Sequence, residues 1–156
     1  MLITETRLRE TIQRILLEVD EAKMQKKLAG IAKVWKTITE NEPFANKKDP
    51  EALFEMGRGI HMLFGKIANF PDSRDIAKRH DKRRKDKSHL KNLKALKGKT
   101  KEDFKSKTSG EKGAGFKLKR AAAHLERTTK RLLSDIKEDE DIMKIIDQAT
   151  GGSFEP

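Results

Sequence analysis

Residues 49–70 read DPEALFEMGRGIHMLFGKIANF, and this stretch decides the fold. Its apolar side chains recur at the spacing of helical turns. They are Leu53, Ile60, Phe64 and Ile67, with Phe54, Met56 and Leu63 widening the face. Asp49 is a favourable N-cap, and Pro50 suits the first helical position after it. We expect this helix, the most apolar of the chain, to form the centre of the core. Three glycines weaken it as a helix, so we expect close helix approach at Gly57, Gly59 and Gly65.

Two apolar stripes precede this helix. The first comprises Leu8, Ile12, Ile15 and Val19, and the second comprises Met24, Leu28, Ile31, Trp35 and Ile38. Thr4 is placed to cap the first stripe, with Ile3 packing on Leu8. The five-residue step between the stripes leaves two alternatives, a break near Asp20 or a continuous helix whose halves face different neighbours.

The region after residue 71 is less apolar. We expect a basic helix over 72–97, anchored only at a few positions and with its middle free of the core, and a flexible Gly/Lys-rich loop over 98–116. A C-terminal helix follows over 117–150, with a possible kink in its acidic stretch, and then a tail over 151–156. Its stripe runs from Leu118 to Ile136.

Composition supports a single small all-α domain. Of the 156 residues 35% are apolar and 39% are charged, so only part of the chain can enter a core. Alternating β-type patterns are missing. We therefore predict a helical bundle of about four to five helices, with its core over 19–71, a possible leader helix over 1–18, and an extended, highly basic helix.

The positive charge is confined to one segment. Residues 72–120 contain 19 Lys and Arg against 7 Asp and Glu, whereas the other 107 residues carry 17 against 18. This density indicates a surface that binds polyanions. Nucleic acid is the simplest such partner, because lysine and arginine bind its phosphates whatever the base sequence. The acidic stretch 134–147 is a candidate for intramolecular pairing with it, which would compete with nucleic acid.

The side chains predicted to contact phosphate all lie between residues 74 and 101. They are Arg74, Lys78, Arg79, Lys82, Arg83, Arg84, Lys85, Lys87, Lys91, Lys94, Lys97, Lys99 and Lys101. Aromatic residues do not interleave with them, so base stacking is not expected.

No pattern in the sequence indicates catalysis, a metal site or a cofactor. His61, His80, His89 and His124 are too widely spaced for a metal-binding motif, and we expect them to be structural or surface residues. Cysteine is missing, which excludes disulfides and thiolate sites. The longest early apolar run, residues 15–17, is too short for a signal peptide or membrane span. We expect a non-enzymatic protein that is neither secreted by a signal peptide nor bound to a membrane.

The first 18 residues, MLITETRLRETIQRILLE, form a short amphipathic segment. This segment resembles the capsid-targeting leader of internal head proteins of tailed bacteriophages, which a maturation protease removes after an Ile/Leu-x-Glu triplet. The resemblance implies cleavage after Glu18, at Leu16-Leu17-Glu18, and a location in the virion or the host cytoplasm. The alternative is an ordinary first helix packed on the core.

Three hypotheses follow from these features. The first is a basic, phage head-associated or internal protein that binds nucleic acid, DNA by preference, non-specifically through residues 72–120. The second is a structural or adaptor protein of a virion or other assembly. In it the stripes of residues 24–38 and 118–136 bind partner helices, and the basic segment contacts an acidic protein. The third is an RNA- or ribosome-associated factor.

Overall fold

The computed structural model describes residues 4–41, 49–70, 74–105 and 113–152, and over these ranges it contains seven helices and no strand. The all-α class is confirmed, with more helices than the four to five predicted. The helices are α1 (Glu5–Glu40), α2 (Pro50–Ala68), α3 (Arg74–Arg84), α4 (Lys87–Leu96), α5 (Lys101–Lys105), α6 (Ala114–Glu138) and α7 (Glu140–Thr150). Within the same ranges, none of them has both the length and the apolar character needed to cross a bilayer.

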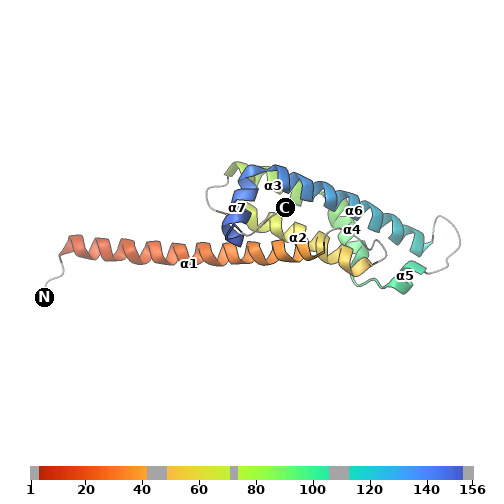
Figure 1. Ribbon diagram of the computed structural model, residues 1–156, viewed down its shortest axis with the longest axis horizontal. Coiled ribbons are helices and arrows are strands. Elements are labelled where there is room, and N and C mark those ends of the chain that lie inside the picture. The colour runs from red at the N-terminus through yellow and green to blue at the C-terminus, as the bar shows by residue number, and fades with distance from the viewer. Residues whose placement is uncertain (1–3, 42–48, 71–73, 106–112, 153–156) are drawn as a thin grey trace.

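Helix α2 lies in the middle of the body and contacts α1, α3, α4 and α6 (Figure 1). Its fully buried side chains are Met56, Ile60, Leu63, Phe64 and Ile67. The carboxylate of Asp49 accepts hydrogen bonds from the amides of Glu51 and Ala52 at 3.1 and 3.4 Å, which fixes the start of the helix. The predicted cap and the central position of this helix are both confirmed.

Two of the three glycines in α2 mark close helix approach. A Cβ atom at Gly57 would lie 2.9 Å from Leu93 of α4 and 3.1 Å from Leu125 of α6, and one at Gly59 would lie 3.1 Å from Ile38 of α1. Gly65 differs, because its nearest neighbour would be 3.5 Å away, an ordinary van der Waals distance. Close approach therefore explains the first two glycines and not the third.

Helix α1 is continuous, and its two halves have different surroundings. The C-terminal half packs on α2 and α7 and buries Ile31, Trp35 and Ile38 to 1% exposure or less. The N-terminal half projects beyond the body (Figure 1). We call residues 5–23 the arm. Apart from Val19, whose side chain is not described, every arm residue is exposed. The prediction of a first helix packed on the core is therefore wrong for the arm.

The start of α1 also differs from expectation. Thr4 occupies the N-cap position, but its side chain makes no capping hydrogen bond. Ile3, the predicted packing partner of Leu8, lies outside the described residues, and Leu8 itself is 50% exposed.

The predicted basic helix over 72–97 is two helices. The chain leaves the helical conformation at Lys85 and Asp86, where the Asp86 carboxylate accepts from the amides of Ser88 and His89 at 2.9 and 3.3 Å and so begins α4. Its middle is not free of the core, because His80 and His89 are buried to 0% and 1% exposure. The two imidazoles supply the anchoring that a search for aliphatic residues overlooks.

The predicted flexible loop over 98–116 is partly helical. Residues 101–105 form α5, which packs on α6 through the half-buried Phe104, and α6 begins at Ala114 rather than at residue 117. Residues 106–112 of this prediction lie outside the described residues. The predicted kink in the acidic stretch is confirmed, since Asp139 separates α6 from α7 and caps α7 by accepting from the amide of Ile142 at 3.3 Å.

The stripes assigned to partner helices are largely internal. Ile31, Trp35 and Ile38 of one stripe are buried in the core, as are Leu125, Leu132 and Ile136 of the other. The prediction that these faces bind partner proteins is wrong, because this chain itself covers them.

Candidate functional site

The basic run of α3 is largely neutralised by carboxylates. Arg79 lies 3.4 Å from a carboxylate oxygen of Asp139 and 3.5 Å from one of Asp141, and Arg83 lies 3.7 Å from one of Asp135. The predicted pairing between the acidic C-terminal stretch and the basic segment is therefore confirmed. These two arginines are held by the protein itself.

Two further cations of the run share one carboxylate. Arg84 and Lys85 lie 3.4 and 2.9 Å from the two oxygens of Asp81. The hydrogen bond from Lys85 lowers the pKa of Asp81 below its ordinary value, so that this carboxylate stays charged. Lys78 and Lys82 are exposed and form no ion pair with the described residues. Arg74 is the first residue of α3, and its side chain is not among those that the structure describes.

Helix α4 presents three of the predicted lysines together. Lys87, Lys91 and Lys94 follow one another at i, i+4 and i+7, which places them on one face of the helix, and all three are exposed. The remaining predicted lysines are more scattered. Lys97 follows the last residue of α4, Lys99 lies half-buried in the link to α5, and Lys101 begins α5.

A groove of about 580 Å³ runs between α4 and α6, and its charged lining is entirely basic. Four cations line it, Lys91 from α4 and Lys117, Arg120 and Arg127 from α6. The other lining residues are small or neutral, and they are Ser88, Asn92, Ala95, Ala121, Ala123 and His124. We call this feature the α4–α6 groove. An extended anion would meet four cations there and no carboxylate of the lining.

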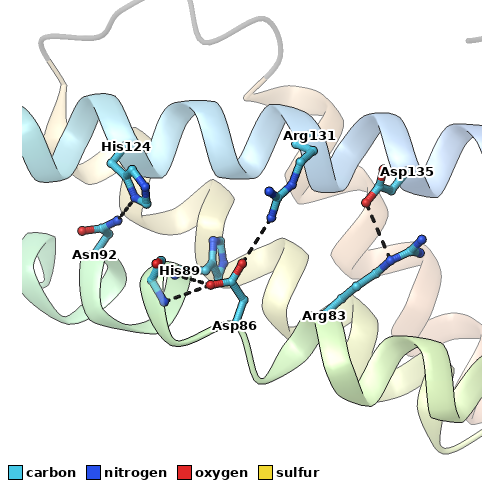
Figure 2. Close-up of polar contacts among 8 residues, drawn as sticks. Arg83, Asp86, His89, Asn92, His124, Arg131 and Asp135 are labelled. Carbon is cyan, nitrogen blue, oxygen red and sulfur yellow. Dashed lines mark hydrogen bonds and ion pairs between the residues drawn. The ribbon is translucent and has the colours of Figure 1, made fainter.

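A neutral contact joins the two walls of the groove. The side-chain amide of Asn92 on α4 hydrogen-bonds Nδ1 of His124 on α6 over 2.5 Å, as Figure 2 shows. Because neither partner is a carboxylate, this link holds the helices together without cancelling the charge of the neighbouring cations.

Farther along α6 the cations of the groove, which have no ion pair with described residues, give way to cations paired with carboxylates. Arg131 lies 3.2 Å from Asp86, and Asp135 receives Arg83 (Figure 2). The hollow between α3 and α6 at this point, of about 540 Å³, is lined by charges of both signs. The face of α6 therefore has a basic N-terminal half and a neutralised C-terminal half.

The first turns of α6 accumulate like charge. Lys117, Lys119 and Arg120 lie there, and the first turn contains no acidic residue. The N-terminal end of a helix already carries partial positive charge, so these cations repel it and one another. An anion bound in the α4–α6 groove would relieve that repulsion.

Of the 13 side chains predicted from the sequence to contact phosphate, only Lys91 lines this groove. Lys117, Arg120 and Arg127 were not among them. The signal that would have found them is the 3-4-3-4 spacing of Lys117, Arg120, His124, Arg127 and Arg131, which places a polar stripe on one face of α6. Counting charges by segment favoured the densest basic run, in α3. The charge of the groove instead depends on which cations share one face of α6.

The histidines are structural where they are buried. Nε2 of His89 lies 3.1 Å from the carbonyl oxygen of Gly57, and His61 is half-buried with its ring centroid 6.4 Å from that of His89. Burial lowers the pKa of both. His124 is exposed in the groove. Within the described ranges no three His, Asp or Glu side chains gather in a way that would hold a metal ion.

No match was found when the chain was compared with protein-family models, with curated proteins and with solved structures.

Proposed function

We propose that this protein binds nucleic acid, DNA by preference, non-specifically and without catalysis, with the α4–α6 groove as the principal phosphate contact. The observation that carries the proposal is the lining of that groove, in which Lys91, Lys117, Arg120 and Arg127 converge without a carboxylate. Lysine and arginine contacts to phosphate release condensed counterions, so they bind any sequence and weaken as salt rises.

The ion pairs of α3 refine which residues take part. Arg79, Arg83, Arg84 and Lys85 already contact carboxylates of this chain, so their contribution to phosphate binding is reduced. Lys87 and Lys94, on the same face of α4 as Lys91, extend the basic surface beyond the groove. The proposed surface is therefore centred on α4 and α6.

A fluorescence titration with a DNA duplex at several salt concentrations tests the proposal. Replacing Lys91, Lys117, Arg120 and Arg127 with Gln is expected to reduce the slope of log affinity against log salt by about 3 to 4, since each lost phosphate contact removes about 0.9. The matched control replaces four exposed lysines outside the groove, Lys23, Lys26, Lys33 and Lys144, with Gln.

The control removes the same charge but no groove contact, so it is expected to keep most of the slope. Equal losses in the two variants would show that only net charge matters, and undetectable binding at low salt would reject nucleic acid as the partner. The same titration with RNA distinguishes the RNA-associated alternative, which requires the tighter binding to be to RNA.

The arm favours a second candidate function, a role in an assembly such as a phage head. Glu18 lies in the exposed part of α1, and among the described side chains of that helix the first buried one is that of Ile31. Cleavage after Glu18, as the resemblance to capsid-targeting leaders implies, would remove a segment whose described side chains, those of residues 4–18, are all exposed. Mass spectrometry of the protein isolated from its native particle tests this, since a chain beginning at Met1 there contradicts processing.

A further inference from the structure

The arm carries an apolar stripe that nothing in the described part of the chain covers. Leu8, Ile12, Ile15 and Leu16 fall within about 100° of one another around the helix and are 49 to 57% exposed. Leu17 is on the opposite side and is 70% exposed. The stripe is as wide as the buried face of an ordinary amphipathic helix.

A lone helix of this length is only marginally stable in water, because local bonds barely offset the entropy of ordering it. The arm has one ion pair of its own among the described contacts, Arg9 with Glu5 at 2.7 Å, and both side chains are more than three-quarters exposed. Exposed pairs of this kind contribute little. A partner that covers the stripe would therefore stabilise the arm considerably.

The charges of the arm indicate which partner fits. Its first half carries Arg7, Arg9 and Arg14 with Glu5 and Glu10, a net charge of +1, whereas its second half carries Glu18, Asp20 and Glu21 with Lys23, a net charge of −2. Two arms side by side in parallel would place these three carboxylates against three others. In the antiparallel arrangement each acidic half lies along the Arg-bearing half of the other arm, so the charge pattern is complementary to a reversed copy of itself.

The spacing of the stripe is also compatible with reversal. If the two-fold axis passes between residues 13 and 14, Ile12 of one copy meets Ile15 of the other, and the same pair recurs across the axis. The two-fold axis makes these two central layers equivalent, and each is a pair of isoleucines. Leu16 lies at the edge of the stripe and adds width to the contact.

We propose that the protein forms a homodimer through antiparallel pairing of its arms, centred on Ile12 and Ile15. The body reaches α1 at least as far as Leu28, which packs against the core about 14 residues from the axis, so at 1.5 Å per residue these contact points of the two bodies lie roughly 40 Å apart. The bodies therefore do not collide, and both α4–α6 grooves stay accessible. The dimer does not depend on the proposed nucleic-acid binding.

Analytical ultracentrifugation of the full chain, from about 1 µM to about 1 mM, tests the dimer. The mass is expected to rise from one chain to two across the series. Ile12→Glu is expected to weaken association at least tenfold, because it places a carboxylate in the central layers. Leu17→Glu is the matched control, since it adds the same charge on the opposite face and is expected to leave association unchanged.

The orientation is tested separately. The chain has no cysteine, so Thr6→Cys gives a single site for a spin label. In the antiparallel dimer residue 6 lies opposite residue 21 of the second copy, so the two labelled positions are offset by roughly 22 Å along the axis in addition to the interaxial distance of about 10 Å. In a parallel pair only the interaxial distance separates the two helix positions, so the distance between labels is shorter. A single-chain mass throughout the series, equal effects of Ile12→Glu and Leu17→Glu, or the short distance would each overturn the proposal.

Discussion

The imidazole of His80 lies against the ring of Phe64, with the ring centroids 4.9 Å apart and the planes tilted by 30°. His80 is fully buried, and neither of its ring nitrogens has a hydrogen-bond partner among the described residues. This burial, reinforced by the nearby cations of Arg83 and Arg79 and opposed by Asp139, lowers its pKa from 6.5 to about 4. His80 thus serves the core as a neutral aromatic residue.

We predict that acid destabilises the protein through this histidine. The unfolded chain binds the proton near pH 6.5, whereas the folded chain resists it until about pH 4, so stability is complete above pH 6.5 and falls as the pH drops towards 4. Between pH 7 and pH 5 the loss of unfolding free energy from His80 is roughly 2 kcal/mol. His61 and His89, whose pKa values are also lowered, add to it. Urea unfolding at pH 7 and pH 5 measures the change.

His80→Leu is the variant that isolates this contribution. It keeps an apolar side chain against Phe64 and removes the titrating group, so its unfolding free energy is expected to vary less between pH 7 and pH 5 than that of the wild type. An unchanged pH dependence would assign the acid sensitivity to other groups.

Replacing glycine with alanine in α2 is expected to change the stability in opposite directions at two positions. Gly57→Ala is expected to destabilise the protein by about 1 kcal/mol, because the new methyl would lie 2.9 Å from Leu93 and 3.1 Å from Leu125, both buried. Gly65→Ala is expected to stabilise it by up to about 1 kcal/mol, since the space is sufficient and alanine favours the helix. Chemical denaturation of both variants checks the signs, and two changes of equal sign would contradict the packing argument.

Asp86 connects the break in the basic segment to α6. It caps α4 and lies 3.2 Å from Arg131. We expect Asp86→Ala to cost about 1 to 2 kcal/mol and Asp86→Asn less than about 0.5 kcal/mol, because asparagine retains the cap and the exposed ion pair contributes little. If the two variants unfold alike in urea, the ion pair rather than the cap fixes this junction.

Periodicity predicted the parts of the fold that bury aliphatic side chains. The central position of α2, its cap at Asp49 and the division near Asp139 all follow from residue types and spacing. The anchoring of the middle of the basic segment did not, because it comes from His80 and His89, whose rings count as polar in any hydropathy pattern. The same limit applies to the apolar stripe of the arm, which begins at Leu8. Periodicity reveals that a helix has an apolar face, but it does not reveal whether another part of this chain covers that face.

The candidate site shows a related limit. A charge count identified residues 72–120 but ranked the run of α3 highest, where Arg79 and Arg83 meet carboxylates from residues 135–141. The α4–α6 groove requires knowing that two helices about 30 residues apart in sequence lie side by side. The basic stripe on α6 can be recognised in the sequence. That α4 forms the other wall of the groove cannot.

We predict that the arm is dispensable for folding. Deleting residues 1–18 is expected to change the unfolding free energy by less than about 0.5 kcal/mol, measured at a concentration too low for arms to pair, because the described side chains removed are all exposed. Ile31→Ala, at a fully buried position in the C-terminal half of α1, is the contrasting variant and is expected to cost about 2 to 4 kcal/mol. A large loss on deletion would mean that the arm packs on the body.

The final prediction concerns the carboxylates that hold the arginines of α3. Replacing Asp135 and Asp141 with Asn frees Arg83 and one of the two contacts of Arg79, so affinity for DNA is expected to rise and the salt slope to steepen by about 1. The control variant replaces Glu140 with Gln and Asp147 with Asn. It adds the same net charge, but neither side chain forms an ion pair with the described residues.

The comparison between these two variants separates local from global electrostatics. If the acidic stretch competes with phosphate for the arginines, the first variant binds DNA more tightly than the control at every salt concentration. The difference in affinity shrinks as salt rises, because salt screens the charges of both variants. Equal gains in the two variants would show that the stretch acts only through net charge. The freed α3 arginines would then make no phosphate contact of their own, which leaves the α4–α6 groove as the principal phosphate contact.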